Sequence, residues 1–304
     1  YTVPDGYTGG AVWGAAPAVD AKRNSLYIAT GNNYSIPASA TACVSAATTD
    51  AARAACIPAS DMFDAIVSLD LTTGAVKWAM RALPSDAWNA ACGISFLPGF
   101  DFPTAGCPSD PGPDFDFGQA PTLYKVKGME FVGAGQKSGK YWAVNPDTGA
   151  VLWSQQAGTG GVAGGLQWGS AVDGSRVYTA NANSEAKAWT LKDGTVTHAG
   201  GWSALDAATG RVIWTTAAPS GAGAPGPVTA VDGVIFGCSA DNDGHLYALK
   251  ASSGAILWDY ASGDTCYSGA SVVDSTVYWG TGYTLLPPDT HPGGALYAFS
   301  LKGK

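Results

Sequence analysis

The sequence has little of what metal and nucleophile sites require. Its three histidines, His198, His245 and His291, are scattered along the chain, and no Cys-x-x-Cys is present. Neither a zinc site nor a Ser-His-Asp arrangement is therefore supported. No Cys-x-x-Cys-His occurs either, so any haem would lie on another chain or in a segment outside this sequence.

The chain also has no cluster of Lys or Arg and no long apolar run. With a formal net charge of −8, it is a poor match for nucleic acid or an anionic membrane, and an uncharged small or polymeric substrate fits better. No apolar segment reaches the roughly 18 residues that a membrane span needs. We therefore expect no membrane span in this sequence.

Turn-forming and strand-forming residues are abundant instead. The sequence contains 41 Gly and 18 Pro among aromatic and β-branched residues, and no convincing amphipathic helical stretch appears. This composition suits short strands joined by many turns. The fold class that it predicts is all-β.

One turn occurs four times. A small residue is followed two positions later by Asp, Asn or Lys, then by a Thr-Gly or Ser-Gly pair, and a Trp stands four residues after the Gly. The Asp or Asn side chain can bond backbone groups two residues on, and the Gly can adopt the positive φ that the turn requires. The Trp is expected to wedge between neighbouring repeats. The four Gly and Trp pairs are Gly74 and Trp78, Gly149 and Trp153, Gly210 and Trp214, and Gly254 and Trp258.

Self-similar strand-turn-strand units predict a single β-propeller domain, 1–304, built from four-stranded blades. Five blades are expected, the last of them incomplete, and residues 1–6 read as the end of a preceding blade. Those residues could instead complete the fifth sheet and close a five-bladed ring, although Pro4 suits only an edge position. The predicted blades are 11–80, 118–156, 165–216, 225–260 and 267–304.

Two insertions, 33–63 and 84–117, interrupt the repeat, and each contains two cysteines. Neither packing nor metal-ligand spacing explains cysteines in such segments, so we expect disulfides that hold the insertions over one face. Six cysteines allow 15 pairings; proximity favours Cys43–Cys56, Cys92–Cys107 and Cys238–Cys266. Disulfides imply an oxidising compartment, extracellular or periplasmic.

The four turns and the segment that contains Trp13 and Asn32 resemble quinoprotein alcohol dehydrogenases, propellers that carry pyrroloquinoline quinone, and most closely the polyvinyl alcohol dehydrogenase group. The resemblance implies that Trp13 forms the floor of the quinone and that Asn32 ligates calcium. Trp168 lies in a similar Gly-rich stretch of the third repeat. It could join the cofactor site, or both Trp residues could serve blade packing.

Further site residues follow from the same resemblance. Lys137, in Gly-Gln-Lys-Ser-Gly, matches the cation that bonds the quinone oxygens. The segment 83–89 resembles the family's P-x-D-x-W-D, but Asn89 replaces the catalytic base, and Asp86 is either a substitute base or a turn cap. The family's Glu ligand to calcium would lie before Tyr1, and its vicinal cysteines are absent.

The function that the resemblance implies is oxidation of a secondary or polymeric alcohol by hydride transfer to pyrroloquinoline quinone, with calcium and an electron-accepting cytochrome as partner. The quinoproteins have eight blades, so these five are expected to be the C-terminal part of an eight-bladed ring that upstream blades or another chain would complete. The alternative is a non-catalytic extracellular propeller that serves as a binding or assembly module, because a fold alone does not specify function.

Overall fold

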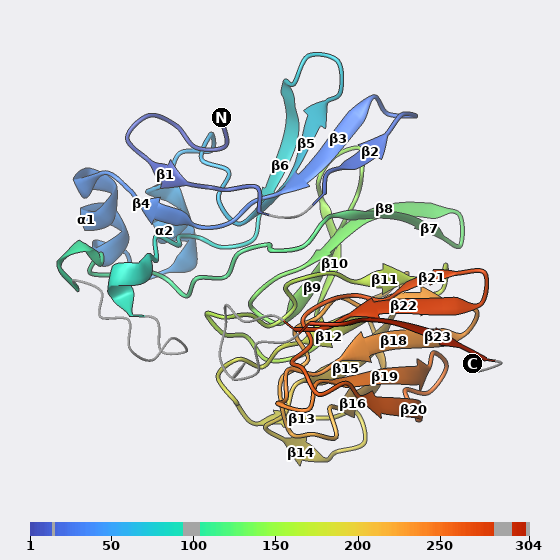
Figure 1. Ribbon diagram of the computed structural model, residues 1–304. Coiled ribbons are helices and arrows are strands. Elements are labelled where there is room, and N and C mark those ends of the chain that lie inside the picture. Colours follow the sequence, from blue (N-terminus) through green and yellow to red (C-terminus); the bar gives the residue numbers. More distant parts are fainter. Residues whose placement is uncertain (14–15, 94–103, 283–293, 302–304) are drawn as a thin grey trace.

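The computed structural model describes residues 1–13, 16–93, 104–282 and 294–301. Their regular structure is almost entirely β, which confirms the predicted fold class. Four antiparallel sheets have four strands each and one has three, and each sheet follows the order of the strands in the chain. In Figure 1 the green second repeat follows the blue first one, and the yellow, orange and red repeats overlap in the lower part of the view.

The strands of the five sheets have the following bounds. The first sheet comprises β2 (Ala18–Asp20), β3 (Ser25–Ala29), β5 (Ala65–Asp70) and β6 (Val76–Arg81), and the second β7 (Thr122–Val126), β8 (Met129–Gly135), β9 (Lys140–Val144) and β10 (Val151–Gln156). The third comprises β11 (Ala171–Val172), β12 (Arg176–Asn181), β15 (Gly201–Asp206) and β16 (Val212–Ala217). The fourth comprises β17 (Thr229–Val231), β18 (Val234–Cys238), β19 (His245–Lys250) and β20 (Ile256–Ala261), and the last β21 (Ser271–Val273), β22 (Thr276–Gly280) and β23 (Leu296–Ser300).

The first strands of the sheets are shorter than the sequence suggests. The predicted blades begin at residues 11, 118, 165 and 225, but their first strands β2, β7, β11 and β17 begin several residues later. Pro17, Pro121 and Pro227 precede three of these strands. Proline lacks the N–H that a ladder needs, so pairing starts only after it.

The repeated turn connects the last two strands of one sheet and packs against the Trp of the preceding sheet. In the first turn, Asp70 Oδ1 accepts hydrogen bonds from the backbone N–H groups of Thr72 and Thr73 at 3.1 and 2.9 Å. The Trp of each repeat lies against the Gly of the next repeat's turn, because a Cβ built on that Gly would approach the indole within about 2.6 Å. These pairs are Trp78 with Gly149, Trp153 with Gly210 and Trp214 with Gly254. The wedge expected for these Trp residues is therefore present.

The apolar core lies mainly between adjacent sheets. One cluster combines Tyr178, Trp202 and Trp214 of the third sheet with Ile235 and Tyr247 of the fourth. The last of the four turn Trp residues has no later turn to pack on among the described residues. Trp258 remains 36% exposed and contacts Phe299 of β23 edge to face, with ring centroids 5.0 Å apart.

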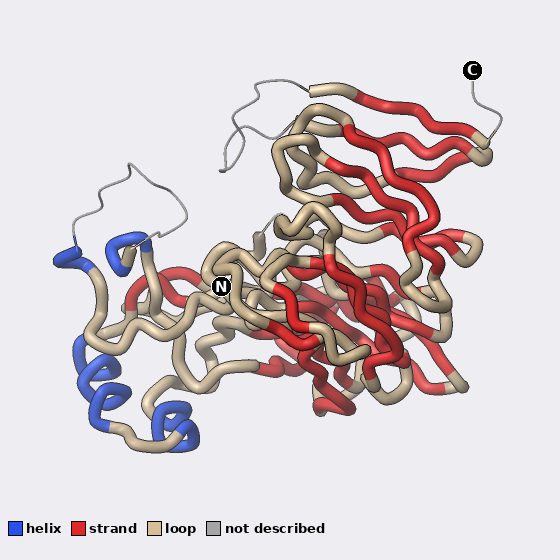
Figure 2. Tube along the Cα trace, turned by 90° about the horizontal axis from the view of Figure 1, so that it is seen from below, coloured by secondary structure: helices blue, strands red, loops and turns tan. Residues whose placement is uncertain are grey.

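The first insertion contains structure that the sequence analysis did not expect. Helices α1 (Ala38–Ala46) and α2 (Asp50–Ala55) lie there, away from the sheets, as Figure 2 shows. Alanine has the highest helix propensity, and Thr49 caps α2 by accepting a hydrogen bond from the N–H of Ala52 at 3.2 Å. A small core of its own anchors the insertion, with the members Ala40, Val44, Ile57 and Phe63.

Residues 1–6 contain no strand. The carbonyl of Thr2 instead accepts a hydrogen bond from the N–H of Met62 at 2.8 Å, and the Thr2 hydroxyl donates to the carbonyl of Gly10 at 2.7 Å. A little farther on, β1 (Thr8–Gly9) pairs with β4 (Asn33–Ser35) of the first insertion. The start of the sequence therefore packs on that insertion rather than extending a blade as an outermost strand.

The three expected disulfides are present. Cys43–Cys56 ties α1 to the end of α2, Cys92–Cys107 closes the second insertion, and Cys238–Cys266 links β18 to the segment before β21.

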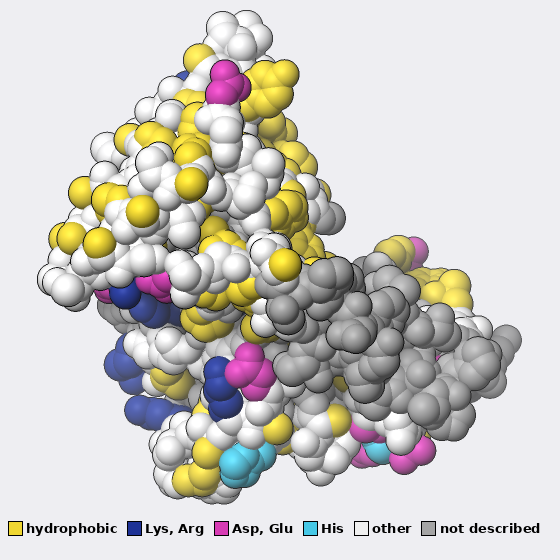
Figure 3. All heavy atoms as spheres, turned by 90° about the vertical axis from the view of Figure 1, so that its left-hand side faces the viewer, with side chains coloured by type: hydrophobic (Ala, Val, Ile, Leu, Met, Phe, Trp, Pro, Cys, Tyr) yellow, Lys and Arg dark blue, Asp and Glu magenta, His cyan; other side chains and the backbone are white. Residues whose placement is uncertain are grey.

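In the part of the chain that the structure describes, no helix is long and apolar enough to cross a membrane. On the face shown in Figure 3, hydrophobic side chains are interspersed with polar ones, whereas Lys and Arg gather on one flank.

Candidate functional site

Two of the expected site residues lie at equivalent positions of neighbouring blades. Asn32 follows β3 and Lys137 follows β8, each the second strand of its sheet. A segment of the second insertion passes between them. The Asp116 carboxylate accepts a hydrogen bond from the backbone N–H of Asn32 at 2.6 Å, and the Asp116 carbonyl accepts one from the backbone N–H of Lys137 at 3.0 Å. This segment thus brings the ends of the two strands into one site.

Lys137 is the centre of a buried charge cluster. Its side chain is 4% exposed, and its ammonium donates to Asp114 Oδ2 at 3.0 Å and forms an ion pair with Asp116 Oδ2. Burial alone would lower the pKa of Lys137, but the charges of Asp116 and Asp114 outweigh it and raise this pKa above its usual range. The lysine therefore stays cationic inside the protein.

A pair of tryptophans lies beside this cation, and one of the two contacts it directly. The Lys137 ammonium lies 4.9 Å from the centroid of the Trp13 ring, within the range of a cation–π contact. Trp168 meets Trp13 edge to face, with centroids 6.2 Å apart and an interplanar angle of 64°. Gly31 allows Trp13 and Asp116 to lie close to the backbone, because a Cβ on Gly31 would be 2.6 Å from Trp13 Nε1 and even closer to the Asp116 carboxylate. The structure therefore brings together the expected Trp13, Trp168 and Lys137.

Asp64 adds a further carboxyl group whose environment is unusual. It is fully buried, and neither of its side-chain oxygens has a hydrogen-bond partner in the described residues. Burial, reinforced by the charges of Asp86, Asp116 and Asp114, raises the pKa of Asp64 well above its ordinary value. Asp64 and Asp114 also have positive φ values of 43° and 60°, a conformation that Asp tolerates better than most non-glycine residues.

Asp86 and Asn89 lie beside the cluster with structural partners. Asp86 Oδ2 accepts from the N–H of Phe115 at 2.9 Å and Oδ1 from the N–H of Trp88 at 3.2 Å, and burial raises the pKa of Asp86 to about 7. Asn89 caps a short 3-10 helix, η1 (Ala90–Cys92), and donates to the carbonyl of Tyr34 at 2.9 Å. Both side chains therefore hold the second insertion in place.

The possible metal ligands are oxygens of Asn32 and the aspartates. The Asn32 amide nitrogen donates to the carbonyl of Trp88 at 2.7 Å, which leaves its Oδ1 as the atom that could face a cation. Carboxylate and amide oxygens are the ligands that calcium prefers. Among the described residues, however, no group of three or more His, Cys, Asp or Glu is arranged to hold a metal ion.

The sequence analysis missed Asp64, Asp114 and Asp116. The last two alternate with aromatic residues in Asp114-Phe115-Asp116-Phe117. An alternation of acidic and aromatic residues indicates a segment with one polar and one apolar side, and this signal could have identified the pair. For Asp64 the sequence offers no comparable signal, because only the packing of blades and insertion buries it.

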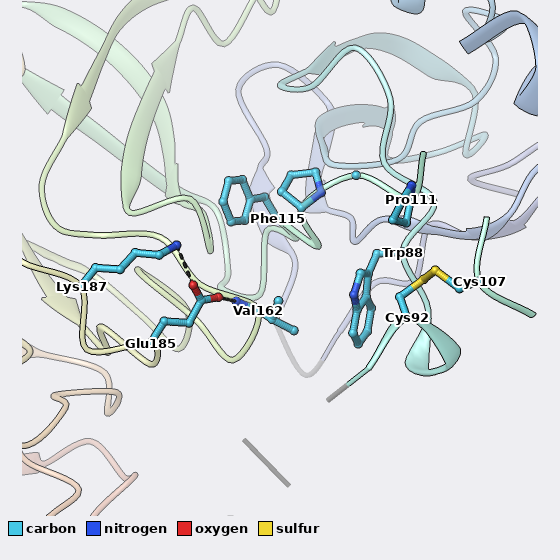
Figure 4. Close-up of a pocket in the computed structure, with 10 residues that line it drawn as sticks. Trp88, Cys92, Cys107, Pro111, Phe115, Val162, Glu185 and Lys187 are labelled. Atoms are coloured by element: carbon cyan, nitrogen blue, oxygen red, sulfur yellow. Dashed lines mark hydrogen bonds and ion pairs between the residues drawn. A yellow bond between two sulfur atoms is a disulfide. The ribbon is translucent and has the colours of Figure 1, made fainter. Parts of the chain in front are cut away.

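A cavity of about 400 Å³ opens next to the cluster. One wall carries Phe115 and Trp88 together with the Cys92–Cys107 disulfide of the second insertion. The facing wall carries Val162, Glu185 and Lys187 of the loops around the third sheet, as Figure 4 shows. Phe115 lies between Asp114 and Asp116 in the sequence, so the segment that carries these two aspartates forms part of one wall of this cavity.

The fold, built from successive four-stranded antiparallel sheets, is that of a β-propeller and resembles the propellers of quinoprotein dehydrogenases. A polyvinylalcohol dehydrogenase of Sphingopyxis sp. (strain 113P3) is 30% identical over 329 aligned residues, which cover 98% of this chain and 46% of that protein. One of Pseudomonas sp is 27% identical over the same share of each. The chain therefore spans about half the length of the curated relatives that it matches.

Solved structures and a family model agree with this class. The quinohemoprotein alcohol dehydrogenase of Comamonas testosteroni superimposes with a TM-score of 0.67 at 18% identity, over 98% of this chain and 49% of that one. The model of the PQQ_2 family, described as outer membrane protein assembly factor BamB, matches residues 137–304. Because this match covers more than half of the sequence, the chain belongs to that family.

Proposed function

We propose that this chain forms part of an alcohol dehydrogenase that depends on pyrroloquinoline quinone and calcium and oxidises a secondary or polymeric alcohol. The observation that carries the proposal is the cluster in which Lys137 is held by Asp114 and Asp116 beside the face of Trp13. The relatives that match nearly the whole chain are polyvinylalcohol dehydrogenases, and they support the same proposal.

The residues present fit such a cofactor. Trp13 is only partly buried, its Nε1 is buried without a hydrogen-bond partner in the described residues, and Lys137 lies against its ring. An indole face suits a flat, conjugated molecule. When bound, the quinone would accept the hydride that leaves the alcohol carbon. Lys137 would stabilise negative charge that develops on oxygen in this site, and Trp168 would support Trp13 edge-on.

Asp114 is better placed than Asp116 to accept the proton of the alcohol hydroxyl. Both carboxylate oxygens of Asp116 have partners, the N–H of Asn32 and the ammonium of Lys137, whereas only Oδ2 of Asp114 is bonded in the described residues. Burial raises the pKa of Asp114, and Lys137 opposes that effect. A raised pKa makes the carboxylate a stronger base, but near neutral pH only its deprotonated fraction can accept a proton, and this fraction grows as the pH rises toward the Asp114 pKa of about 8. Asp116 would position Lys137 and Asn32, whose Oδ1 would face the calcium.

The compartment and the electron acceptor follow from the same proposal. Three disulfides are stable in an oxidising environment, so we place the protein outside the cytoplasm, in the periplasm or the extracellular space. Electrons from the reduced cofactor need an acceptor, and the proposed one is a cytochrome. One of the structural neighbours is named a quinohemoprotein, so by its name that protein contains a haem.

The test uses the full-length protein, titrated with calcium and the quinone and assayed by dye-linked oxidation of secondary alcohols. Asp114→Asn is expected to lower kcat at least 100-fold, the usual loss on removing a general base, whereas Asp86→Asn retains turnover in the folded fraction. Absence of cofactor uptake by the intact protein would refute the proposal. The reverse ranking of the two variants would restore Asp86 as the base.

A second candidate function rests on the family model. Its description names an outer membrane protein assembly factor, and the alternative is that this propeller is a non-catalytic module for binding or assembly. Asn89, which replaces the expected base, favours this alternative. It predicts that the protein binds no quinone and that its stability is unchanged when quinone and calcium are added, which thermal denaturation would measure.

A further inference from the structure

A second and larger cavity adjoins the one beside the Lys-Asp cluster. Its volume is about 660 Å³, and Lys187 lines both cavities. The second cavity lies between the loop that follows β10 and a hairpin formed by β13 (Trp189–Thr190) and β14 (Val196–Thr197). Lys187 therefore borders both spaces, at the base of the hairpin.

This hairpin is an addition to the third sheet. In the second sheet a tight turn joins β8 to β9, and in the fourth a short loop joins β18 to β19, but in the third the chain leaves β12 at Asn181 and returns to β15 only at Gly201. The two short strands pair with each other and with no strand of the blade. The blade does not need them, so what they contribute is a wall of the cavity.

The side chains on this wall suit a neutral chain that carries hydroxyl groups. Thr159, Thr190 and Lys192 line the cavity, which has no Asp or Glu among its lining residues. Trp189 supplies a flat apolar face, and its Nε1 donates to the carbonyl of Ala199 at 2.8 Å, which fixes the ring. An aromatic face next to hydroxyl and amine groups can hold the CH and OH groups of such a chain together.

The junction between the cavities is rigidly built. Lys187 forms an ion pair with Glu185 at 2.6 Å, and Glu185 accepts a hydrogen bond from the N–H of Val162 at 3.0 Å; both contacts are drawn in Figure 4. Lys187 also donates to the carbonyl of Gly160 at 3.3 Å. The root of the hairpin is thus tied to the loop that follows β10, on the side of the cavity facing the cluster.

We infer that the hairpin cavity is a distal subsite that binds a second stretch of an extended polyhydroxylated substrate while one of its carbinol units occupies the site beside Asp114. The inference rests on the proposed function and specifies its substrate class as a chain longer than a single alcohol unit. A small secondary alcohol would fill only the space next to the cluster and would not contact Trp189.

The experiment separates the two kinds of substrate in the full-length enzyme. Trp189→Ala removes the aromatic face, and Thr190→Trp fills the cavity. Each variant is expected to raise KM for polyvinyl alcohol about tenfold, which is the size of effect that the loss of one aromatic contact gives. Neither is expected to change kcat or KM for a monomeric secondary alcohol. Val196→Ala, at a 60% exposed position of the same hairpin that does not line the cavity, is the matched control.

A binding measurement without turnover separates this inference from the proposed function. Titration calorimetry of polyvinyl alcohol into the intact protein is expected to show binding that Trp189→Ala weakens and Val196→Ala leaves unchanged, even if no alcohol is oxidised. Absence of polymer binding by the unmodified protein would overturn the inference. Equal effects of Trp189→Ala on polymer and monomer, or no effect on either, would overturn it as well.

Discussion

At the scale of single residues, the cluster around Lys137 depends on charge compensation inside the protein. One buried ammonium offsets two buried carboxylates at Asp114 and Asp116. Taking charges out of water is costly, and their mutual attraction repays that cost only while every partner is present. Removing the cation should therefore be more harmful than removing all three charges.

We expect Lys137→Met to destabilise the protein by about 3 kcal/mol at pH 8, and by less at pH 5, because the carboxyl groups can then take up protons. The triple variant Asp114→Asn, Asp116→Asn and Lys137→Met should recover most of this loss. Urea denaturation at both pH values measures the effect. A single variant as stable as the unmodified protein at pH 8 would mean that water, not Lys137, compensates the aspartates.

Asp61, in the first insertion, provides a pH-dependent contribution. It is 1% exposed and accepts a hydrogen bond from the side chain of Asn33 at 2.8 Å. Burial raises the pKa of Asp61 to about 6, although the Asn33 bond and the charge of Arg81 act in the opposite direction. The pKa of Asp in the unfolded chain is near 4. At pH values between about 4 and about 6, the folded protein therefore retains a proton on Asp61 that the unfolded chain has released.

The stability that this group contributes is consequently present below about pH 4 and lost as the pH rises through 6. We expect Asp61→Asn to gain on the order of 2 kcal/mol relative to the unmodified protein between pH 4 and pH 7, from the shift of its pKa. The difference in unfolding free energy between the two proteins, followed across this range, provides the measurement. A difference that does not change with pH would contradict a raised pKa.

At the scale of elements, the repeated turn has two separable tasks. Gly74 and Gly149 have nearly the same positive φ, 73° and 71°, but a Cβ on Gly74 would meet nothing within 4 Å, whereas one on Gly149 would meet the Trp78 ring at 2.6 Å. The first glycine serves only the backbone conformation. The second also makes room for the indole of the preceding blade.

Gly74→Ala should therefore cost about 1 kcal/mol, the penalty of positive φ alone. Gly149→Ala should cost at least 2 kcal/mol more, since overpacking adds to that penalty. Thermal denaturation of the two variants compares them directly, with Gly74→Ala as the control. If both variants lose the same stability, the Trp residues do not transmit packing between blades.

At the scale of the whole molecule, the disulfides stabilise different parts. Cys43–Cys56 closes a separation of 13 residues within the helical insertion, whereas Cys238–Cys266 closes 28 and connects the fourth sheet with the last one. Restriction of the unfolded chain gives each of them about 3 kcal/mol. The two disulfides differ in which segments of the protein lose stability when the bond is removed.

We expect Cys43→Ser with Cys56→Ser to abolish amide-exchange protection in α1 and α2 and to leave the sheets protected. Cys238→Ser with Cys266→Ser should instead reduce protection in β18 and β22, because both cysteines are fully buried between these sheets. Hydrogen exchange with mass spectrometry resolves the segments. Uniform loss in both double variants would show that the insertion and the blades unfold as one unit.

The sequence by itself determined the strand order, the turns and the three disulfides. The turns depend on contacts within a few residues: Asp70 bonds N–H groups two and three positions on, and Gly74 supplies the positive φ. The paired cysteines are 13, 15 and 28 residues apart, which is near enough in the sequence for proximity to favour these pairings. Local patterns of this kind are written directly into the order of residues. The helices of the first insertion were missed because their Ala-rich segments show little amphipathic pattern.

Only the tertiary structure decided which side chains meet at the candidate site. Asn32, Asp116 and Lys137 are far apart in the sequence, and they converge because the second strands of two neighbouring blades end on the same side and an insertion passes between those ends. Asp86, which the sequence left as either a substitute base or a turn cap, accepts hydrogen bonds from the backbone N–H groups of Phe115 and Trp88. Burial and charge compensation depend on this long-range packing, so the pKa of each carboxyl group was fixed only when the blades and the insertion came together.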